Sequence, residues 1–165
     1  MKHLIIISTI ILALIGCKEE DNCLDYSSNS GLIIMEQNMG ECYSIMSEDE
    51  YLITCDSAYK KLPETTYDSI QETLGCGGNP DRPTINFDDY YLLGAKTIAQ
   101  GCLVTYDRDV QYDSITKELE YTVNVHQCGN CADRRYHMNW VLIKHDTIFQ
   151  NISYKVQINY YIESN

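Results

Sequence analysis

The second half of the chain alternates between apolar and polar residues, a pattern typical of half-buried β-strands, whose successive side chains point to opposite faces. Residues 119–126 read Leu-Glu-Tyr-Thr-Val-Asn-Val-His, and residues 152–160 repeat the alternation. Three more stretches are predicted as strands: 90–98, 102–112 and 136–144. Because the connections are short, among them a turn at 114–117, we expect consecutive strands to pair as an antiparallel meander.

The first half of the chain predicts shorter elements. Residues 32–35 and 40–46 are expected to form short strands. Residues 47–50, Ser-Glu-Asp-Glu, match a capping box, in which the serine and the last glutamate satisfy free amides of a first helical turn. Apolar residues follow at helical spacing, which predicts a helix over residues 48–58. Residues 60–84 contain all three prolines and are expected to form a long loop.

These elements predict an α+β fold made mainly of an antiparallel β-sheet of about five to seven strands, with one short helix near the N-terminus. Composition supports the strands, because the chain has 14 Tyr residues and tyrosine is a strong strand former. The pattern extends over residues 31–165, which we expect to form a single β-rich domain.

The N-terminus has the pattern of an export signal. Lys2 precedes a short apolar run, which is too short to span a bilayer comfortably and is typical of a secretory signal peptide over residues 1–16. The run ends in Leu14-Ile15-Gly16-Cys17 and resembles the lipobox of bacterial lipoproteins. The resemblance implies cleavage before Cys17 and lipid on its thiol, followed by a lipidated tether over residues 17–30. An uncleaved anchor helix is the alternative.

The residues after Cys17 carry a further hint about location. Lys18-Glu19-Glu20-Asp21 resembles the signal that sends lipoproteins of the Bacteroidota to the outer face of the outer membrane. We therefore expect a lipid-anchored, surface-exposed protein of the outer membrane. A periplasmic orientation, with these charges acting only as a solvated tether, is the alternative.

Net charge limits the classes of partner. Removal of residues 1–16 leaves 149 residues and changes the net charge from −12 to −13. Such a charge argues against nucleic acid, whose phosphates require a positive partner. It also argues against a protein that rests directly on anionic lipid head groups. The acidic balance favours solubility, divalent cations or a basic partner.

Eight cysteines are many for a chain of this size, and an exported chain meets an oxidising compartment, so disulfides are expected. If Cys17 carries lipid, an odd number of candidates remains, and one thiol is left over. The disulfide candidates are Cys23, Cys42, Cys55, Cys76, Cys102, Cys128 and Cys131.

Sequence does not determine the connectivity of these cysteines. We expect Cys55 to pair with Cys76 and so to tie the helix to the loop after it. Cys102 is expected to pair across neighbouring strands with Cys128 or Cys131. For Cys23, the alternatives are a bond with Cys42 or a free thiol.

Cys128-Gly129-Asn130-Cys131 is a C-x-x-C motif, the spacing of thiol–disulfide oxidoreductases. In those enzymes the motif opens a helix, whereas here a strand is predicted after it, so structural disulfides are favoured. Zinc is a further alternative, with His126, Cys128, Cys131 and His137 as ligands. An oxidising compartment makes that site less favourable, and we expect no metal and no cofactor.

Other residues with possible chemistry are interpreted as surface features. Asp88 with Asp89 and Asp107 with Asp109 lack the spacing of a calcium loop, and nothing in the sequence places two of them across a cleft. The tyrosines and Trp140 could form a sugar-stacking surface, but alternating aromatics in a sheet are more often core.

The arrangement over residues 40–160 is carried by the approach Ile85-Asn86-Phe87, Tyr91-Leu92-Leu93-Gly94, Gly101-Cys102, and strands around Tyr121, Trp140 and Tyr154. It resembles small, uncharacterised lipoproteins of the Bacteroidota and is distantly similar to the C-terminal domain of PrcB-type protease-complex stability proteins. The resemblance implies a non-catalytic role in binding another envelope protein or stabilising a complex. A redox protein that uses the C-x-x-C motif and a glycan-binding surface module are the alternatives.

Overall fold

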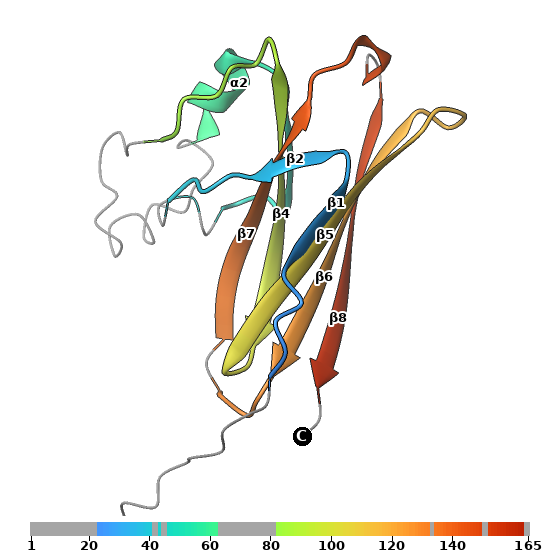
Figure 1. Ribbon diagram of the computed structural model, residues 1–165. Coiled ribbons are helices and arrows are strands. Elements are labelled where there is room, and N and C mark those ends of the chain that lie inside the picture. The colour runs from blue at the N-terminus through green and yellow to red at the C-terminus, as the bar shows by residue number, and fades with distance from the viewer. Residues whose placement is uncertain are drawn as a thin grey trace, which may run out of the picture.

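The computed structural model describes residues 23–40, 43, 46–62, 82–132, 134–149 and 152–163. These residues form two four-stranded β-sheets packed face to face (Figure 1). Sheet A has the order β1-β5-β6-β8, and its strands are β1 (Ser28–Gly31), β5 (Leu103–Asp113), β6 (Glu118–Cys128) and β8 (Ser153–Glu163). Sheet B has the order β2-β7-β4-β3, and its strands are β2 (Ile33–Glu36), β7 (Arg134–Lys144), β4 (Tyr90–Gln100) and β3 (Glu50–Ile53).

The main core lies between the two sheets. Alternate residues of β6 face inward and are fully buried, and they meet inward residues of β4 and β7. The centre of this core includes Leu93, Tyr121, Val123, Val141 and Ile143. The alternation in the sequence therefore marks the interior face of sheet A correctly.

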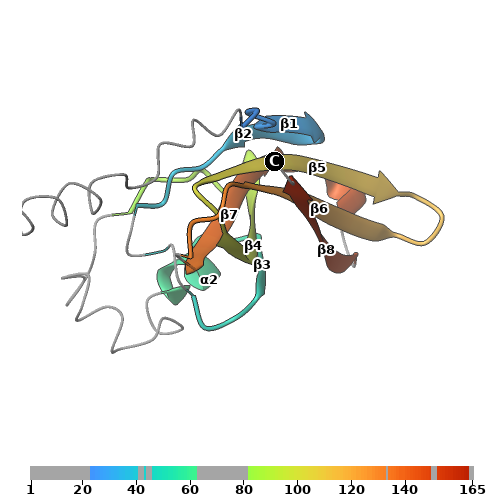
Figure 2. The ribbon, with the colours of Figure 1, turned by 90° about the horizontal axis from the view of Figure 1, so that it is seen from below.

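A second apolar cluster covers the other face of sheet B. The short helix α2 (Asp56–Lys60) supplies Tyr59, which packs with Trp140 and Leu142 of β7 and Leu92 of β4. Figure 2 shows α2 on the side of sheet B that faces away from sheet A. The described chain thus has three layers: sheet A, sheet B, and α2 with its flanking loops.

The strand assignments in the second half of the chain are confirmed, and the domain is mainly β-sheet with a short helix and disulfides. The single meander is wrong. Among the described strands, two consecutive pairs are antiparallel neighbours, β3 with β4 and β5 with β6, but the chain changes sheet after β1, β4, β6 and β7 and so does not form one meander. In addition, β1 pairs with β5 and β8 pairs with β6 in parallel.

The helix predicted over residues 48–58 is also wrong. Residues 50–53 form β3, which pairs antiparallel with Leu92–Ala95 of β4, and the helix begins only at Asp56. The edge of β4 supplies tertiary hydrogen bonds that outweigh the local capping signal. The strand predicted over 40–46 and the loop predicted over 60–84 lie largely outside the described residues.

The tether predicted over residues 17–30 is too long, because residues from Cys23 onward belong to the folded domain.

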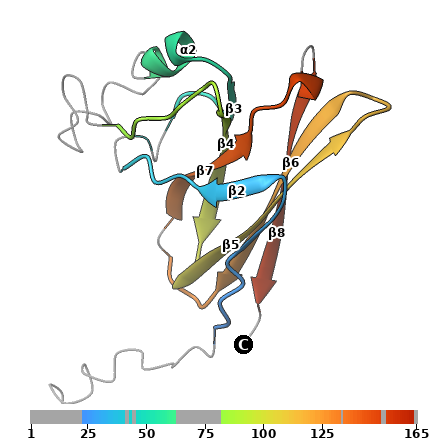
Figure 3. The same cartoon turned by 45° about the horizontal axis from the view of Figure 1, so that its top comes forward.

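β1 and β2 meet at a corner where the chain passes from sheet A to sheet B (Figure 3). Gly31 occupies this corner at φ +67°, and a Cβ there would lie 2.1 Å from the Val110 carbonyl oxygen. Glycine is required at this position for both reasons.

Candidate functional site

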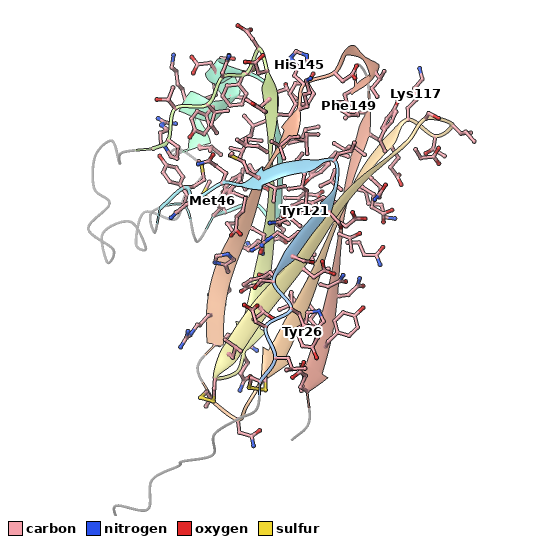
Figure 4. All side chains as sticks on the ribbon, viewed as in Figure 1. Tyr26, Met46, Lys117, Tyr121, His145 and Phe149 are labelled. Atoms are coloured by element: carbon pink, nitrogen blue, oxygen red, sulfur yellow. A yellow bond between two sulfur atoms is a disulfide. The ribbon has the colours of Figure 1, made fainter. Side chains whose placement is uncertain are left out.

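Both described disulfides lie at one end of the sandwich, where β4 joins β5 and β6 leads to β7 (Figure 4). Cys102 pairs with Cys131, which is one of its two predicted partners. Cys23 pairs with Cys128, so its predicted bond with Cys42 and its alternative as a free thiol are both wrong. Long-range folding brings residues 105 positions apart together, which local spacing does not reveal.

Cys55 is a free, exposed thiol, so its predicted bond with Cys76 is also wrong. It is the N-cap residue of α2, and its Sγ lies 3.2 Å from the Ser57 Oγ. This hydrogen bond lowers the pKa of the thiol. Cys17, Cys42 and Cys76 lie outside the described residues.

The two cysteines of the C-x-x-C motif form separate bonds, one to Cys23 and one to Cys102. A redox centre needs these two sulfurs to exchange with each other, so the geometry does not favour one. The zinc set is not assembled either, because both cysteines are oxidised and His126 and His137 lie on different sheets. The described residues contain no group of three or more His, Cys, Asp or Glu side chains suited to a metal.

The predicted carboxylate pairs are part of the surface hydrogen bonding. Asp107 accepts hydrogen bonds from Ser28 and from Asn124, the latter at 2.9 Å, and Asn124 accepts one from Asn159 at 2.9 Å. These residues form a polar row across all four strands of sheet A. Asp89 accepts a hydrogen bond from the Asn86 side chain at 2.7 Å in the loop before β4.

Three aromatic rings gather on the outer face of sheet A. His126 lies between Tyr26 and Tyr161, with ring centroids 4.3 Å and 4.9 Å apart and interplanar angles of 20° and 13°. The rings therefore stack face to face and cover one another's faces. A sugar-binding platform needs exposed ring faces in one plane, and this row does not provide them.

A groove lies beside β7, where β2 ends. It encloses about 470 Å³ and is lined by Glu36, Gln37, Asn38, Met39, Gly40, His137, Met138 and Trp140. β2 pairs with β7 only at Val141–Ile143, and one further bond joins the Gln37 N–H to the Trp140 C=O at 2.8 Å. Beyond that bond no strand of the described chain pairs with this edge of β7.

The direction of the free backbone groups follows from that last bond. The Trp140 carbonyl points toward β2, and residues two apart in a strand direct their backbone groups to the same side. The N–H and C=O groups of Met138 and Tyr136 therefore point out along the same edge. The opposite edge of β7 is paired with β4 along its whole length. Such an edge can accept an additional strand.

A buried arginine supports the upper end of this groove. Arg108 of β5 points into the sandwich and is only 3 % exposed. Its Nη1 and Nη2 donate to the two carboxylate oxygens of Glu36, each at 3.2 Å, and its Nε donates to the Asn139 Oδ1 at 3.0 Å. The charge is thus paired and hydrogen-bonded, as a buried charge must be.

The network continues from Asn139 into sheet B. The Asn139 amide donates to the Ala95 carbonyl at 3.3 Å and to the Thr97 hydroxyl oxygen at 3.1 Å. The Tyr121 hydroxyl donates to the Asn139 carbonyl at 3.2 Å. These bonds join β2, β4, β5, β6 and β7, so they fix the two sheets relative to each other behind the groove.

His137 lines the groove and stacks on Tyr106, with ring centroids 4.8 Å apart. Burial lowers the pKa of His137, and the positive charge of Arg108 lowers it further, so the ring is neutral near pH 7. The groove therefore presents a neutral imidazole beside a carboxylate that is paired with Arg108. The site can bind through Glu36 and through the backbone of β7.

Sequence reasoning did not find Glu36, Arg108 or Asn139. One signal was present: Arg108 has the same parity as Tyr106, Val110 and Tyr112 in β5, so it falls on the inward face. A charged residue at an inward position predicts a buried partner. The identity of that partner depends on the contact between two sheets.

Comparisons with known protein families, with curated proteins and with solved structures found no match. Within the described part of the chain, no helix has the length and apolar character needed to cross a bilayer.

Proposed function

We propose that this protein is a non-catalytic, lipid-anchored binding module of the bacterial cell envelope, which receives an extended segment of another envelope protein along the open edge of β7. The observation that carries the proposal is the early departure of β2, which leaves the N–H and C=O groups of Tyr136 and Met138 facing outward beside the groove. Strand addition to such an edge obtains affinity from main-chain hydrogen bonds and specificity from neighbouring side-chain pockets.

The groove indicates the chemistry of the segment. Glu36 is half-exposed, and the chain carries a net charge of −12, so a basic side chain of the segment fits near this carboxylate. Met138 and Trp140 line the groove floor and favour an apolar side chain next to it. The Arg108 network holds the edge rigid, which reduces the ordering cost of binding.

Two substitutions at one position separate backbone pairing from side-chain contact. Tyr136→Pro removes the outward N–H without removing a bond to β4, whereas Tyr136→Thr removes the ring and keeps the N–H. A photocrosslinking residue at position 136 in cells should capture the partner, and one at Gln157 on the outer face of sheet A should not.

With the captured protein identified, we expect Tyr136→Pro to abolish its co-purification and Tyr136→Thr to retain it. Denaturant unfolding of both variants provides the folding control. Equal retention by the proline variant, or equal capture from position 157, would refute strand addition at β7.

A further inference from the structure

Exposed apolar side chains gather at the end of the sandwich that holds the disulfides. Ile162 is 81 % exposed, Leu24 is 61 % exposed, and Leu103, Tyr160 and Tyr161 are exposed beside them. Arg134, which begins β7, is exposed at the same end. Exposed apolar residues that gather in one place, rather than singly, mark an interaction surface.

The opposite end is different in character. Ile115 and Ile148 are exposed there, but a carboxylate precedes each of them by two residues, at Asp113 and Asp146, and accepts a hydrogen bond from its backbone N–H. Figure 4 shows Lys117, His145 and Phe149 at this end, far from the disulfides and Tyr26. Carboxylates occur at both ends, since Asp25 and Glu163 lie at the disulfide end, so the greater number of exposed apolar side chains distinguishes the disulfide end.

The covalent path from the lipid site to the fold is short. The Cys23–Cys128 bond attaches the chain to the end of β6, so only residues 18–22 separate the fold from Cys17. Six fully extended residue steps span at most about 20 Å. β6 and β8 are each 11 residues long, about 36 Å. A lipid on Cys17 therefore keeps the disulfide end nearer to the bilayer than the opposite end.

We propose that the disulfide end rests on the bilayer that holds the anchor, with Leu24, Leu103 and Ile162 in the interface and the strands directed away from the membrane. This rests on the lipidation at Cys17 that is part of the proposed function. Tyr160 and Tyr161 suit this depth, because tyrosine is enriched where membrane meets water, and Arg134 suits the phosphates.

Because the linkage between the lipid and the fold is short, a small apolar surface is enough to hold the domain against the bilayer. Once the lipid is inserted, contact between the domain and the bilayer is intramolecular, so the effective concentration of the membrane surface is high. With the strands directed away from the membrane, the open edge of β7 faces along the bilayer plane and α2 faces the solvent. Asp25 and Glu163 also lie at this end, so anionic lipid should add little to the apolar contact.

Hydrogen–deuterium exchange of the full, lipidated protein in phosphatidylcholine vesicles tests the proposal, with the non-lipidated Cys17→Ser protein as reference. Amides of residues 160–163 should exchange more slowly on vesicles, and amides of residues 113–118 should be unchanged. The paired variant Leu24→Ser/Ile162→Ser should lose this protection. Ile115→Ser, a matched change of an exposed isoleucine at the opposite end, should keep it.

The remaining outcomes would overturn the orientation, the assigned contact residues or the lipid anchor. Equal exchange at residues 160–163 in lipidated and Cys17→Ser protein would overturn the orientation, as would equal protection at both ends. Protection that persists in the paired variant would overturn the assignment of the contact. An unmodified Cys17 by mass spectrometry would instead refute the anchor itself, and strand addition at β7 would be unaffected.

Discussion

The outer faces of the two sheets differ in how far they are covered. The outer face of sheet A carries the polar row of Asp107, Asn124 and Asn159, and no described element covers it. The outer face of sheet B lies under α2 and its flanking loops, with Trp140 3 % exposed. Sheet A is buried on one face only, whereas sheet B is buried on both faces over residues 91–95 of β4 and 138–143 of β7.

This difference appears directly in the sequence. Residues 118–126 of β6 alternate between half-buried and buried, whereas residues 91–95 and 138–143 are buried without interruption. A strand with one solvated face alternates, and a strand covered on both faces becomes continuously apolar. Sheet B is therefore stabilised by a second core, while sheet A relies on its interior face, its polar rows and its disulfide to Cys23.

The disulfide of sheet A should have the largest effect. Cys23→Ser/Cys128→Ser removes a bond between residues 105 positions apart and should lower the free energy of unfolding by about 5 kcal/mol, because the unfolded chain gains the freedom of a long loop. Urea unfolding under non-reducing conditions measures the loss. Cys55→Ser, at the free exposed thiol, should change stability by less than about 0.5 kcal/mol. Similar midpoints for both variants would contradict the role given to the bond.

The second core of sheet B should show the next effect. Trp140→Ala removes a buried indole that donates a hydrogen bond to the Tyr43 carbonyl at 3.0 Å, and we expect a loss of about 3–5 kcal/mol in the same assay. Gln157→Ala on the open face of sheet A should change stability by less than about 0.5 kcal/mol. A loss from Trp140→Ala as small as that of Gln157→Ala would mean that the outer layer adds little to sheet B.

A substitution in the polar row of sheet A should cause the smallest loss of stability, and this loss should depend on pH. Burial raises the pKa of Asp107, but hydrogen bonds from Ser28 and Asn124 and nearby positive charge outweigh it, so the net pKa lies below its ordinary value of 3.8. A carboxylate with a lowered folded pKa stabilises the fold above about pH 4, and this contribution is lost as the pH falls further.

Asn124→Ala removes one donor to Asp107 and should cost about 1 kcal/mol at neutral pH. Its stability should also fall less steeply below about pH 4 than that of the unchanged protein. Thermal unfolding across the acid range measures both quantities. An identical acid slope in the two proteins would show that this hydrogen bond does not set the titration of Asp107.

Much of the fold was predictable where local pattern and tertiary structure agree. The alternating residues of β6 and β8 identified strands and their inward faces because each strand has one face in the core. The helix over residues 48–58 failed because the edge of β4 offered residues 50–53 a strand partner. For the groove, the sequence could predict only that Arg108 faces inward. It could not predict the partners Glu36 and Asn139, because they lie in other strands.

The sequence by itself determined the strand content, the acidic charge, the disulfide-rich character and the prediction of a lipid-modified Cys17, because these depend on composition or on short-range spacing. Only the tertiary structure decided which strands pair, which cysteines bond and where an edge stays open. Those features depend on contacts between residues far apart in the chain, such as Cys23 with Cys128 and Glu36 with Arg108. The early departure of β2 from β7, which creates the proposed binding edge, is set by the path of the whole chain between two sheets and by no local motif.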